Sequence, residues 1–431
     1  MRVLSGRDFL HSRLVQLGGQ GISVRKLGGN RAGEIRLGRF LRNGSVTLEA
    51  MVEEAASRTS LRVVGRHILA IQDTTVIQST GGGGHYLHGM VAVDVDDNAI
   101  LGLIYASALS RTSGEKEKRR ARPVEEKESY RWLQGADAAA GVCSAARQVT
   151  VLADRESDIY EAFARCPAGV DLLIRAAQDR ALEDGERLFA SVDNWPERGS
   201  TQFDLPAAPG RRARQVKLAV RFGPATIKKP KNNKLDKDDI ATCRLNVVDV
   251  REVDPVVGQP PIHWRLLTTH KVDTLMDALG IVELYRRRWS IEQLFRTLKK
   301  QGFDIEGIRM DAEAPRSKLA MAALIAAVSV QQLVHARDGA SPESPLRPIT
   351  DVFDDTDGPL LKAFTASLEG KTERQKNPHP YGSLAYAAWV CARLGGWTGY
   401  YGKPGPAVML DGWLRFQDAK IGAKLIQSQD V

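Results

Sequence analysis

The stretch Tyr285-Arg-Arg-Arg-Trp-Ser-Ile-Glu-Gln-Leu-Phe-Arg-Thr-Leu-Lys299 decides how the rest of the chain is interpreted. It contains no Gly or Pro, and residues of high helix propensity dominate it, so the sequence predicts one continuous helix. At about 100° per residue, four polar side chains fall within roughly 60° of one another, beside an apolar face. These four are Tyr285, Arg288, Glu292 and Lys299. Such a helix can pack on a sheet and present an acid, two cations and a phenol along one edge. The alternative is a solvated face with an intrahelical Arg288–Glu292 pair.

Two further carboxylates are associated with strand-like runs. The mostly apolar run from His67 to Gln72 leads to Asp73, and a second run, Val149 to Ala153, leads to Asp154. Short apolar runs bounded by polar residues are typical of buried strands. Carboxylates at strand ends, together with one on a packed helix, can converge to bind hard divalent cations through oxygen. Two such ions can activate the attacking oxygen and stabilise the leaving oxygen when a phosphodiester is cleaved.

Three sequence motifs together resemble a known family. They are Asp73-Thr-Thr, Asp154-Arg-Glu-Ser-Asp158 and the spacing Tyr285-x2-Arg288-x3-Glu292-x6-Lys299. The chain resembles the DDE cut-and-paste transposases of the insertion-sequence-four group, whose signature is Y-x2-R-x3-E-x6-K. The similarity is strongest from Gly33 to Arg309. It implies an α/β fold: an RNase H-like catalytic core with an inserted β domain, and helical N-terminal and C-terminal regions.

The resemblance and the composition together predict four regions. They are a helical DNA-binding region at 1–62, a catalytic core formed by 63–175 and 270–340, a β-strand insertion at 176–269, and a helical, dimerising region at 341–431. Alternation of apolar and polar residues from Gln215 to Phe222 predicts a half-buried strand in the insertion. The runs Met90–Val95 and Ile100–Leu109, separated by Asp96-Asp97-Asn98, predict a hairpin in the core.

Helices are predicted in the two terminal regions. They cover Leu48–Ala56, Lys318–Ala336, Gly382–Leu394 and Met409–Ile426. Arg39-Phe-Leu-Arg-Asn matches a motif that is usual in the family. The segment before this motif is short in this chain and rich in glycine. A truncated end-recognition domain is therefore expected.

Composition is consistent with a polyanionic partner without identifying one. The 431 residues carry a formal charge of +9 and a pI of about 9.3, a balance that many RNA-binding proteins share. The four cysteines have no metal-ligand spacing and are expected to be reduced thiols. No signal peptide is recognisable, and no apolar run approaches the length of a membrane span. We therefore expect a cytoplasmic protein that binds no membrane, and the resemblance to insertion-sequence transposases implies a bacterial one.

The resemblance assigns roles to named residues. Asp73, Asp154 and Glu292 would be catalytic and would bind two Mg²⁺ ions, for which Mn²⁺ could substitute. Tyr285, Arg288 and Lys299 would hold phosphates of the transferred end. The implied reaction is cleavage at transposon ends through a hairpin intermediate, followed by strand transfer into target DNA. The implied partners are the inverted-repeat ends, target DNA and a second copy of the chain.

Three more residues match family positions that contact a distorted DNA end. Arg175 would help distort it, Trp264 would hold a flipped base, and Trp289 would lie near the same strand. Core packing is the alternative for both tryptophans. Glu156 and Asp158 belong to the second motif, but neither is predicted to be a metal ligand.

Two other functions stay open from sequence. One is a catalytically silent, DNA-binding or inhibitory derivative that keeps the fold, which the short N-terminal region favours. The other is a two-metal DNA nuclease that cannot join strands.

Overall fold

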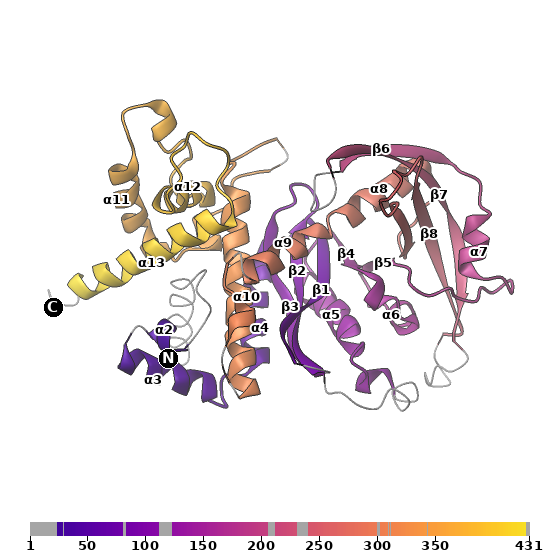
Figure 1. Cartoon of the computed structure of the whole chain (residues 1–431), viewed down its shortest axis with the longest axis horizontal. Coiled ribbons are helices and arrows are strands. Elements are labelled where there is room, and N and C mark those ends of the chain that lie inside the picture. The colour runs from indigo at the N-terminus through magenta and orange to yellow at the C-terminus, as the bar shows by residue number, and fades with distance from the viewer. Residues whose placement is uncertain are drawn as a thin grey trace. The chain divides into compact units, whose positions relative to one another are not determined.

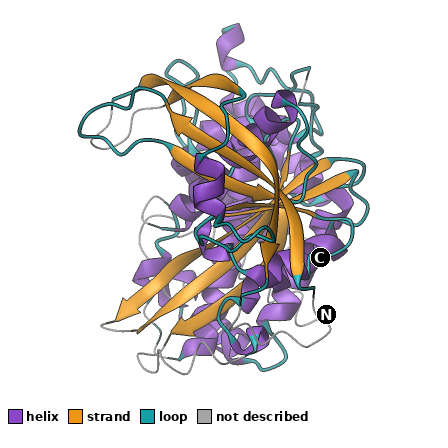
Figure 2. Ribbon diagram, turned by 90° about the vertical axis from the view of Figure 1, so that its right-hand side faces the viewer, coloured by secondary structure: helices purple, strands orange, loops and turns teal. Residues whose placement is uncertain are grey.

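The computed structural model shows a mixed α/β protein in which strands and helices are interleaved along the chain (Figure 2). It describes residues 24–28, 30–80, 83–111, 123–205, 212–230, 240–299, 302–308, 310, 312–342 and 344–427. The chain forms two compact units. Unit 1 comprises Met1–Val63, Thr74–Thr112 and Ser290–Val431, and unit 2 comprises Val64–Asp73 and Ser113–Trp289. The large sheet and the surrounding helices confirm the predicted α/β class.

Unit 2 contains a mixed sheet in the order β1-β4-β5-β9-β8-β7-β6. Its strands are β1 (His67–Thr80, whose first half lies in this unit), β4 (Gln148–Ala153), β5 (Asp171–Arg175), β6 (Gly199–Leu205), β7 (Arg214–Lys228), β8 (Thr242–Glu252) and β9 (His263–Thr268). Strands β1, β4 and β5 are parallel, and the remaining pairs are antiparallel. The predicted strands at His67 and Val149 are therefore confirmed.

Helices cover the sheet of unit 2 (Figure 1). They are α5 (Tyr130–Val142), α6 (Tyr160–Ala164), α7 (Leu188–Asp193) and α8 (Leu275–Arg286), with the short 3-10 turns η2 (Val124–Glu126) and η3 (Arg155–Ser157). Helix α5 contacts β4, α7 contacts β7, and α8 contacts both β7 and β8. Five of the six residues of β4 are buried, as in a strand whose two faces are both covered, whereas the edge strand β6 alternates between half-buried and exposed residues.

Strand β9 joins the strands of the predicted insertion to the core strands. It pairs with β5 on one side and with β8 on the other, so β6 to β9 extend the same sheet. The predicted strand at 215–222 lies within β7. The boundaries of an inserted β domain at 176–269, and an RNase H-like core, stay predictions.

Unit 1 contains the second half of β1 with β2 (Gly83–Asp94) and β3 (Ile100–Arg111), in the order β3-β2-β1. The predicted hairpin is confirmed: β2 and β3 are antiparallel, and the connecting turn places Asn98 at a φ of 61°. Asn tolerates this left-handed conformation better than most residues. The side chain of Asp97 fixes the turn by accepting a hydrogen bond of 2.9 Å from the Ala99 amide.

The helices of unit 1 come from both ends of the chain. They are α2 (Val24–Gly28), α3 (Arg31–Arg42), α4 (Leu48–Arg62), α9 (Trp289–Leu298, from its second residue), α10 (Glu313–Ala336), α11 (Gly358–Leu368), α12 (Leu384–Leu394) and α13 (Pro406–Gln427). Four 3-10 turns accompany the described helices of this unit: η4 (Ile305–Gly307), η5 (Ile349–Asp351), η6 (Asp355–Asp357) and η7 (Glu373–Gln375). The predicted helices are confirmed, and α4 runs six residues past the predicted end at Ala56. The first 23 residues of the predicted DNA-binding region lie outside the described part of the chain.

Helix α10 corrects one expectation. Helix α10 has 24 residues, and its most apolar stretch has a mean hydropathy of 1.7. Among the described helices, α10 is the one that is long and apolar enough to cross a membrane. The prediction that no apolar run approaches that length is wrong. However, 72% of the stretch is buried within the protein, against β3, α3, α4, α12 and α13. A core helix that is covered on most sides accounts for the same composition.

The predicted continuous helix Tyr285–Lys299 is also wrong. Helix α8 ends at Arg286, Arg287 and Arg288 form a turn, and α9 begins at Trp289. The amides of Arg287 and Arg288 bond the carbonyl oxygens three residues earlier, at 3.2 and 3.1 Å. This tighter pattern ends a helix without Gly or Pro. Contrary to the prediction from sequence, Tyr285, Arg288, Glu292 and Lys299 therefore do not lie along one edge of a single helix.

Candidate active site

Two aspartates lie side by side in the sheet of unit 2. Strands β1 and β4 are parallel, and their last paired residues are Ile71 and Leu152. Asp73 and Asp154 each lie two residues beyond this pair, so the register brings them to neighbouring positions. Side chains two residues apart on a strand share a face, so both carboxylates project from the same face of the sheet as that pair.

The backbone around Asp154 fixes one of its carboxylate oxygens. Asp154 is the N-cap of η3, and its Oδ1 accepts a hydrogen bond of 2.9 Å from the Glu156 amide. The local sequence explains this, because an Asp at the end of a strand readily caps a following helical turn. Asp154 as a whole is half-exposed, so a ligand from solvent can reach the residue.

Asp73 is held by an arginine from the turn between α8 and α9. The Arg288 guanidinium donates to Asp73 Oδ2 at 3.2 Å, and the two side chains are 17% and 20% exposed. The sequence prediction placed Arg288 beside Glu292 or a phosphate. The structure gives it a carboxylate partner from the first motif.

Tyr285 lies in the same neighbourhood and is buried. Burial raises the pKa of its phenol, and the nearby Arg288 and Arg175 guanidinium groups oppose that rise. Arg175 is hydrogen-bonded to Tyr285, and it also donates to the His263 carbonyl oxygen at 2.7 Å. Burial lowers the pKa of Arg175, although the neighbouring phenol counteracts this. The structure therefore brings Tyr285, Arg288 and Arg175 together around the two aspartates.

An aromatic cluster adjoins these residues. The rings of Trp264 and Phe203 are stacked, with centroids 6.1 Å apart and an interplanar angle of 15°. The ring centroids of Trp264 and Tyr285 are 5.3 Å apart. The Arg286 guanidinium lies 4.5 Å from the centre of the Phe203 ring. Trp289, by contrast, is 52% exposed. Core packing is thus excluded for Trp289, whereas Trp264 is half-buried.

The other acids of the second motif have structural partners. Asp158 is sealed from solvent and accepts hydrogen bonds from the amides of Ala177 and Gln178, at 2.6 and 2.7 Å, and from Arg180. Glu156 is 58% exposed and pairs with Arg131 at 2.9 Å. Asp158 thus has a structural role, and Glu156 is part of an ion pair with Arg131.

Glu292 and Lys299 belong to unit 1. Glu292 lies in the first turn of α9, and Lys299 follows the last turn of that helix. Lys299 forms an ion pair of 3.1 Å with Glu306. The three predicted acids are therefore divided between the units: two are neighbours in unit 2, and the third is carried by unit 1.

The donor set of unit 2 fits part of a divalent-cation site. Two neighbouring carboxylates offer the oxygen ligands that Mg²⁺ prefers. Within the described ranges, no group of three or more His, Cys, Asp or Glu side chains is arranged to hold a metal ion. A complete protein ligand set thus needs a carboxylate beyond Asp73 and Asp154.

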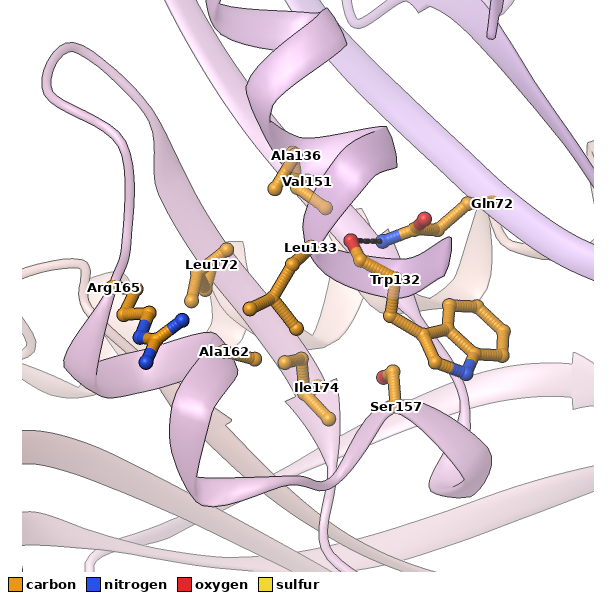
Figure 3. A pocket seen from close by; sticks show the side chains of 10 residues that line it. All are labelled: Gln72, Trp132, Leu133, Ala136, Val151, Ser157, Ala162, Arg165, Leu172 and Ile174. Atoms are coloured by element: carbon orange, nitrogen blue, oxygen red, sulfur yellow. Dashed lines mark hydrogen bonds between the residues drawn. The ribbon is translucent and has the colours of Figure 1, made fainter. Parts of the chain in front are cut away.

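A small cavity lies on the other side of β1 (Figure 3). Gln72 faces it, next to Asp73 but on the opposite face, and donates to the Trp132 carbonyl oxygen at 3.4 Å. Apolar side chains such as Leu133 and Ile174 form most of its wall. It contains no pair of acids, so we interpret it as a packing gap between α5 and the sheet. The Gln72 bond ties β1 to α5 and so supports Asp73 from behind.

Sequence reasoning missed three residues of this neighbourhood. Arg155 is exposed and close enough to Arg175 to lower its pKa, so it adds a third cation beside the aspartates. Its signal was available, because it directly follows Asp154. Phe203 and Arg286 had no comparable signal, since their relation to Trp264 arises only when β6, β9 and α8 fold together.

Comparison with known families matches part of the chain. Residues 131–329 match the family of the transposase DDE domain. This range contains Asp154, Glu292 and the cationic and aromatic residues described above, and it begins after Asp73. The chain therefore carries a region similar to the transposase DDE domain, and a DDE transposase is the class of protein that this similarity supports.

Proposed function

We propose that this protein is a transposase that cleaves DNA at transposon ends and transfers the freed strand into target DNA. The observation that carries the proposal is the pairing of Asp73 and Asp154 at neighbouring positions on parallel strands, ringed by cations. The similarity of 131–329 to the transposase DDE domain supports it independently.

The proposed chemistry is phosphodiester hydrolysis followed by transesterification. A water oxygen bonds to phosphorus, the bond to the 3′ oxygen breaks, and a 3′-hydroxyl is released. That hydroxyl oxygen then bonds to a phosphorus of the opposite strand, and the bond to the 3′ oxygen of the flanking DNA breaks, which frees the flanking DNA and leaves a hairpin. A second water attacks the hairpin phosphorus and releases the 3′-hydroxyl again. This hydroxyl attacks a target phosphodiester and displaces the 3′ oxygen of the target strand. When bound, two Mg²⁺ ions would polarise the phosphate and lower the pKa of the attacking water. Asp73, Asp154 and Glu292 would hold them.

The residues around the aspartates have a positioning role in this proposal. Arg175, Arg288 and Tyr285 would hold phosphate oxygens by charge-assisted hydrogen bonds, which are stronger than neutral ones. Arg288 would serve twice: it neutralises Asp73 before the cations bind, and it is released toward the DNA phosphate afterwards. Lys299 would contact a phosphate in exchange for Glu306.

Replacing the acids tests the proposal. We expect Asp73→Asn, Asp154→Asn and Glu292→Gln each to reduce cleavage of DNA carrying the flanking inverted repeats by on the order of 10³-fold in Mg²⁺. DNA affinity should change little, because contacts to phosphates elsewhere supply most of it. Glu156→Gln is the matched control, since Glu156 is an exposed acid of the same motif. A variant that cuts as fast as this control would remove its residue from the site.

The same assay separates the two other candidate functions. Excision followed by insertion indicates a transposase, cutting without joining indicates a nuclease, and binding without cutting indicates the silent derivative. Analytical sedimentation of the DNA complex tests the proposed homodimer. Cell fractionation tests the proposed location in the cytoplasm, associated with the nucleoid.

Trp264 is proposed to hold a base that leaves the duplex during hairpin formation. Extruding a base costs a few kcal/mol, which stacking on an aromatic ring partly recovers. We expect Trp264→Ala to nick the DNA end normally but to accumulate nicked product instead of hairpin. An abasic nucleotide at the flipped position should partly restore hairpin formation. Equal loss of nicking and hairpin formation would show that Trp264 is structural, and Trp289→Ala tests the second, exposed tryptophan in the same way.

A further inference from the structure

A glycine-rich segment in unit 1 presents two tyrosines to solvent. We call Gly396-Trp-Thr-Gly-Tyr-Tyr-Gly-Lys403, between α12 and α13, the tyrosine loop. Gly396, Gly399 and Gly402 have φ values of 90°, 88° and 53°. Residues with a Cβ rarely adopt these angles, so the glycines allow the loop its folded shape.

Hydrogen bonds hold the tyrosine loop in one conformation. The indole Nε1 of Trp397 donates to the Gly402 carbonyl oxygen at 3.0 Å. The Arg393 guanidinium donates to the carbonyl oxygens of Trp397 and Thr398, at 3.2 and 2.6 Å. Lys403 forms an ion pair of 3.0 Å with Asp338. A loop fixed in this way loses little conformational entropy when a ligand binds.

The rings at the tip of this fixed loop are not covered. Tyr401 is 84% exposed and Tyr400 is 48% exposed. Rigid aromatic side chains that stay exposed offer flat faces for stacking at a low entropic cost. The tip is therefore built to contact a partner with flat, partly apolar faces.

A positively charged turn lies directly beside the tyrosine loop. We call Lys371–Lys376 the basic turn. The Tyr400 hydroxyl is 3.5 Å from Thr372 Oγ1, and a Cβ atom on Gly399 would lie 3.1 Å from the Arg374 carbonyl oxygen. The two segments therefore share one surface.

The basic turn keeps net positive charge after its own pairing. It carries Lys371, Arg374 and Lys376 against a single acid, Glu373, which pairs with Lys376 at 3.0 Å. Among the described residues, no carboxylate pairs with Lys371 or Arg374. Cations next to stacking rings match the two parts of a nucleic-acid strand, its phosphates and its bases.

We propose that the tyrosine loop and the basic turn together bind DNA with unpaired bases. Lys371 and Arg374 contact successive phosphates, and bases stack on Tyr401 and Tyr400. This surface lies outside 131–329 and outside the candidate active site. The inference deepens the proposed function and rests on it in one respect, namely that DNA is the partner.

Binding of the full-length protein to labelled DNA tests this inference. The probes are an oligothymidine strand of about 20 nucleotides and a blunt duplex of the same length. We expect Tyr401→Ala to weaken binding of the single strand about 5- to 100-fold, which corresponds to one lost stacking contact. Binding of the blunt duplex should stay unchanged, and Tyr401→Phe, which keeps the ring, should bind both probes like the wild type.

Matched controls separate stacking from other effects. Tyr381→Ala removes an exposed tyrosine elsewhere in unit 1, 59% exposed, and should leave both affinities unchanged. Replacing Lys371 and Arg374 with alanine should reduce the slope of log affinity against log salt by about 1.4 for the single strand. Lys362→Ala, an exposed lysine on α11, should leave that slope unchanged.

Two outcomes would overturn the inference. One is a Tyr401→Ala variant that binds the single strand as tightly as Tyr381→Ala does. The other is a Tyr401→Ala variant that dissociates into monomers but keeps its DNA affinity, because the loop would then join two copies of the chain. The cleavage assay on the same preparations distinguishes this inference from the proposed function. Wild-type protein that stacks bases but cuts no DNA contradicts only the proposed function.

Discussion

Two aspartates of this protein are paired with arginines in very different surroundings. The Asp73–Arg288 pair is partly open, with both side chains about one-fifth exposed, whereas Asp158 is sealed and Arg180 is 6% exposed. A pair open to solvent contributes little to stability and can be exchanged for other partners. A sealed pair cannot be broken without leaving a buried charge. The open pair therefore suits a binding role, and the sealed pair suits a structural one.

We expect Asp158→Asn to lower the free energy of unfolding of unit 2 by about 3–5 kcal/mol, because Arg180 would stay buried without a counter-charge. Asp73→Asn should change it by less than about 1 kcal/mol. Urea unfolding of both variants, followed by circular dichroism, makes the comparison. Similar losses in the two variants would contradict the division into structural and binding carboxylates.

At the residue scale the sequence predicted the acids better than their partners. Asp73 and Asp154 were predictable because each follows an apolar run that forms a strand. The contact of Arg288 with Asp73 was not, since 215 positions separate the two residues along the chain. Helical spacing favoured Glu292 as the partner of Arg288, and only the folded turn after α8 places its guanidinium on β1.

At the scale of elements, close packing of α4 on β3 constrains unit 1. A Cβ atom on Gly102 would lie 2.1 Å from Thr59 Oγ1, which itself donates to the Leu103 carbonyl oxygen at 2.7 Å. The approach of helix and strand therefore depends on the missing side chain at Gly102.

We expect Gly102→Ala to destabilise unit 1 by about 1–3 kcal/mol, because α4 must move to accommodate the methyl group. In the double variant with Thr59→Ala the cost should be smaller than the sum of the single costs, since each change then makes room for the other. Thermal unfolding of the three variants gives this coupling. Strictly additive losses would show that α4 and β3 do not compete for this space.

Regular periodicity made most elements predictable, and its failures have local causes. Strands β1 and β4, the β2–β3 hairpin and helices α10, α12 and α13 follow from apolar runs bounded by turn residues. The break between α8 and α9 does not, because every residue from Tyr285 to Lys299 tolerates a helix. Its position is set by tertiary contacts, such as that of Arg288, which propensity does not contain.

At the scale of the whole molecule, half-buried histidines couple stability to pH. Burial lowers the pKa of His270 in unit 2 and of His335 and His379 in unit 1. His270 Nε2 lies 2.9 Å from Thr150 Oγ1, and Asp171 lies nearby and favours the charged form, but burial outweighs it and lowers the pKa. Each unit therefore contains groups that resist protonation while folded.

We expect both units to lose stability as the pH falls from about 7.5 to 5.5. The folded-state pKa values lie below the unfolded value of about 6.5, so in that range the unfolded chain binds more protons. The slope is at most about 1.4 kcal/mol per pH unit for each histidine. Melting temperatures across this range test it, and His335→Gln should flatten the slope of unit 1. A pH-independent melting temperature would contradict this assignment.

The division into two units was the least predictable feature. Besides the boundaries after Val63 and Thr112, the chain changes units after Asp73 and after Trp289, inside two of the three motifs. Composition can predict Gly- or Pro-rich linkers. It cannot predict that a continuous strand, or two successive helices, will pass from one compact unit to the other. Charge and the transposase DDE domain similarity indicate DNA as partner, but neither could reveal where the units divide.

The apolar helix α10 also has a consequence for how the chain is made. Its earlier neighbours α3, α4 and β3 leave the ribosome before it, but α12 and α13 follow it. During that interval a helix with a membrane-like composition is only partly covered. We expect nascent chains arrested after Ala336 to associate with membrane vesicles or chaperones, whereas chains completed through α13 are released. Co-sedimentation of the two translation products with vesicles would show whether the order of synthesis protects this helix.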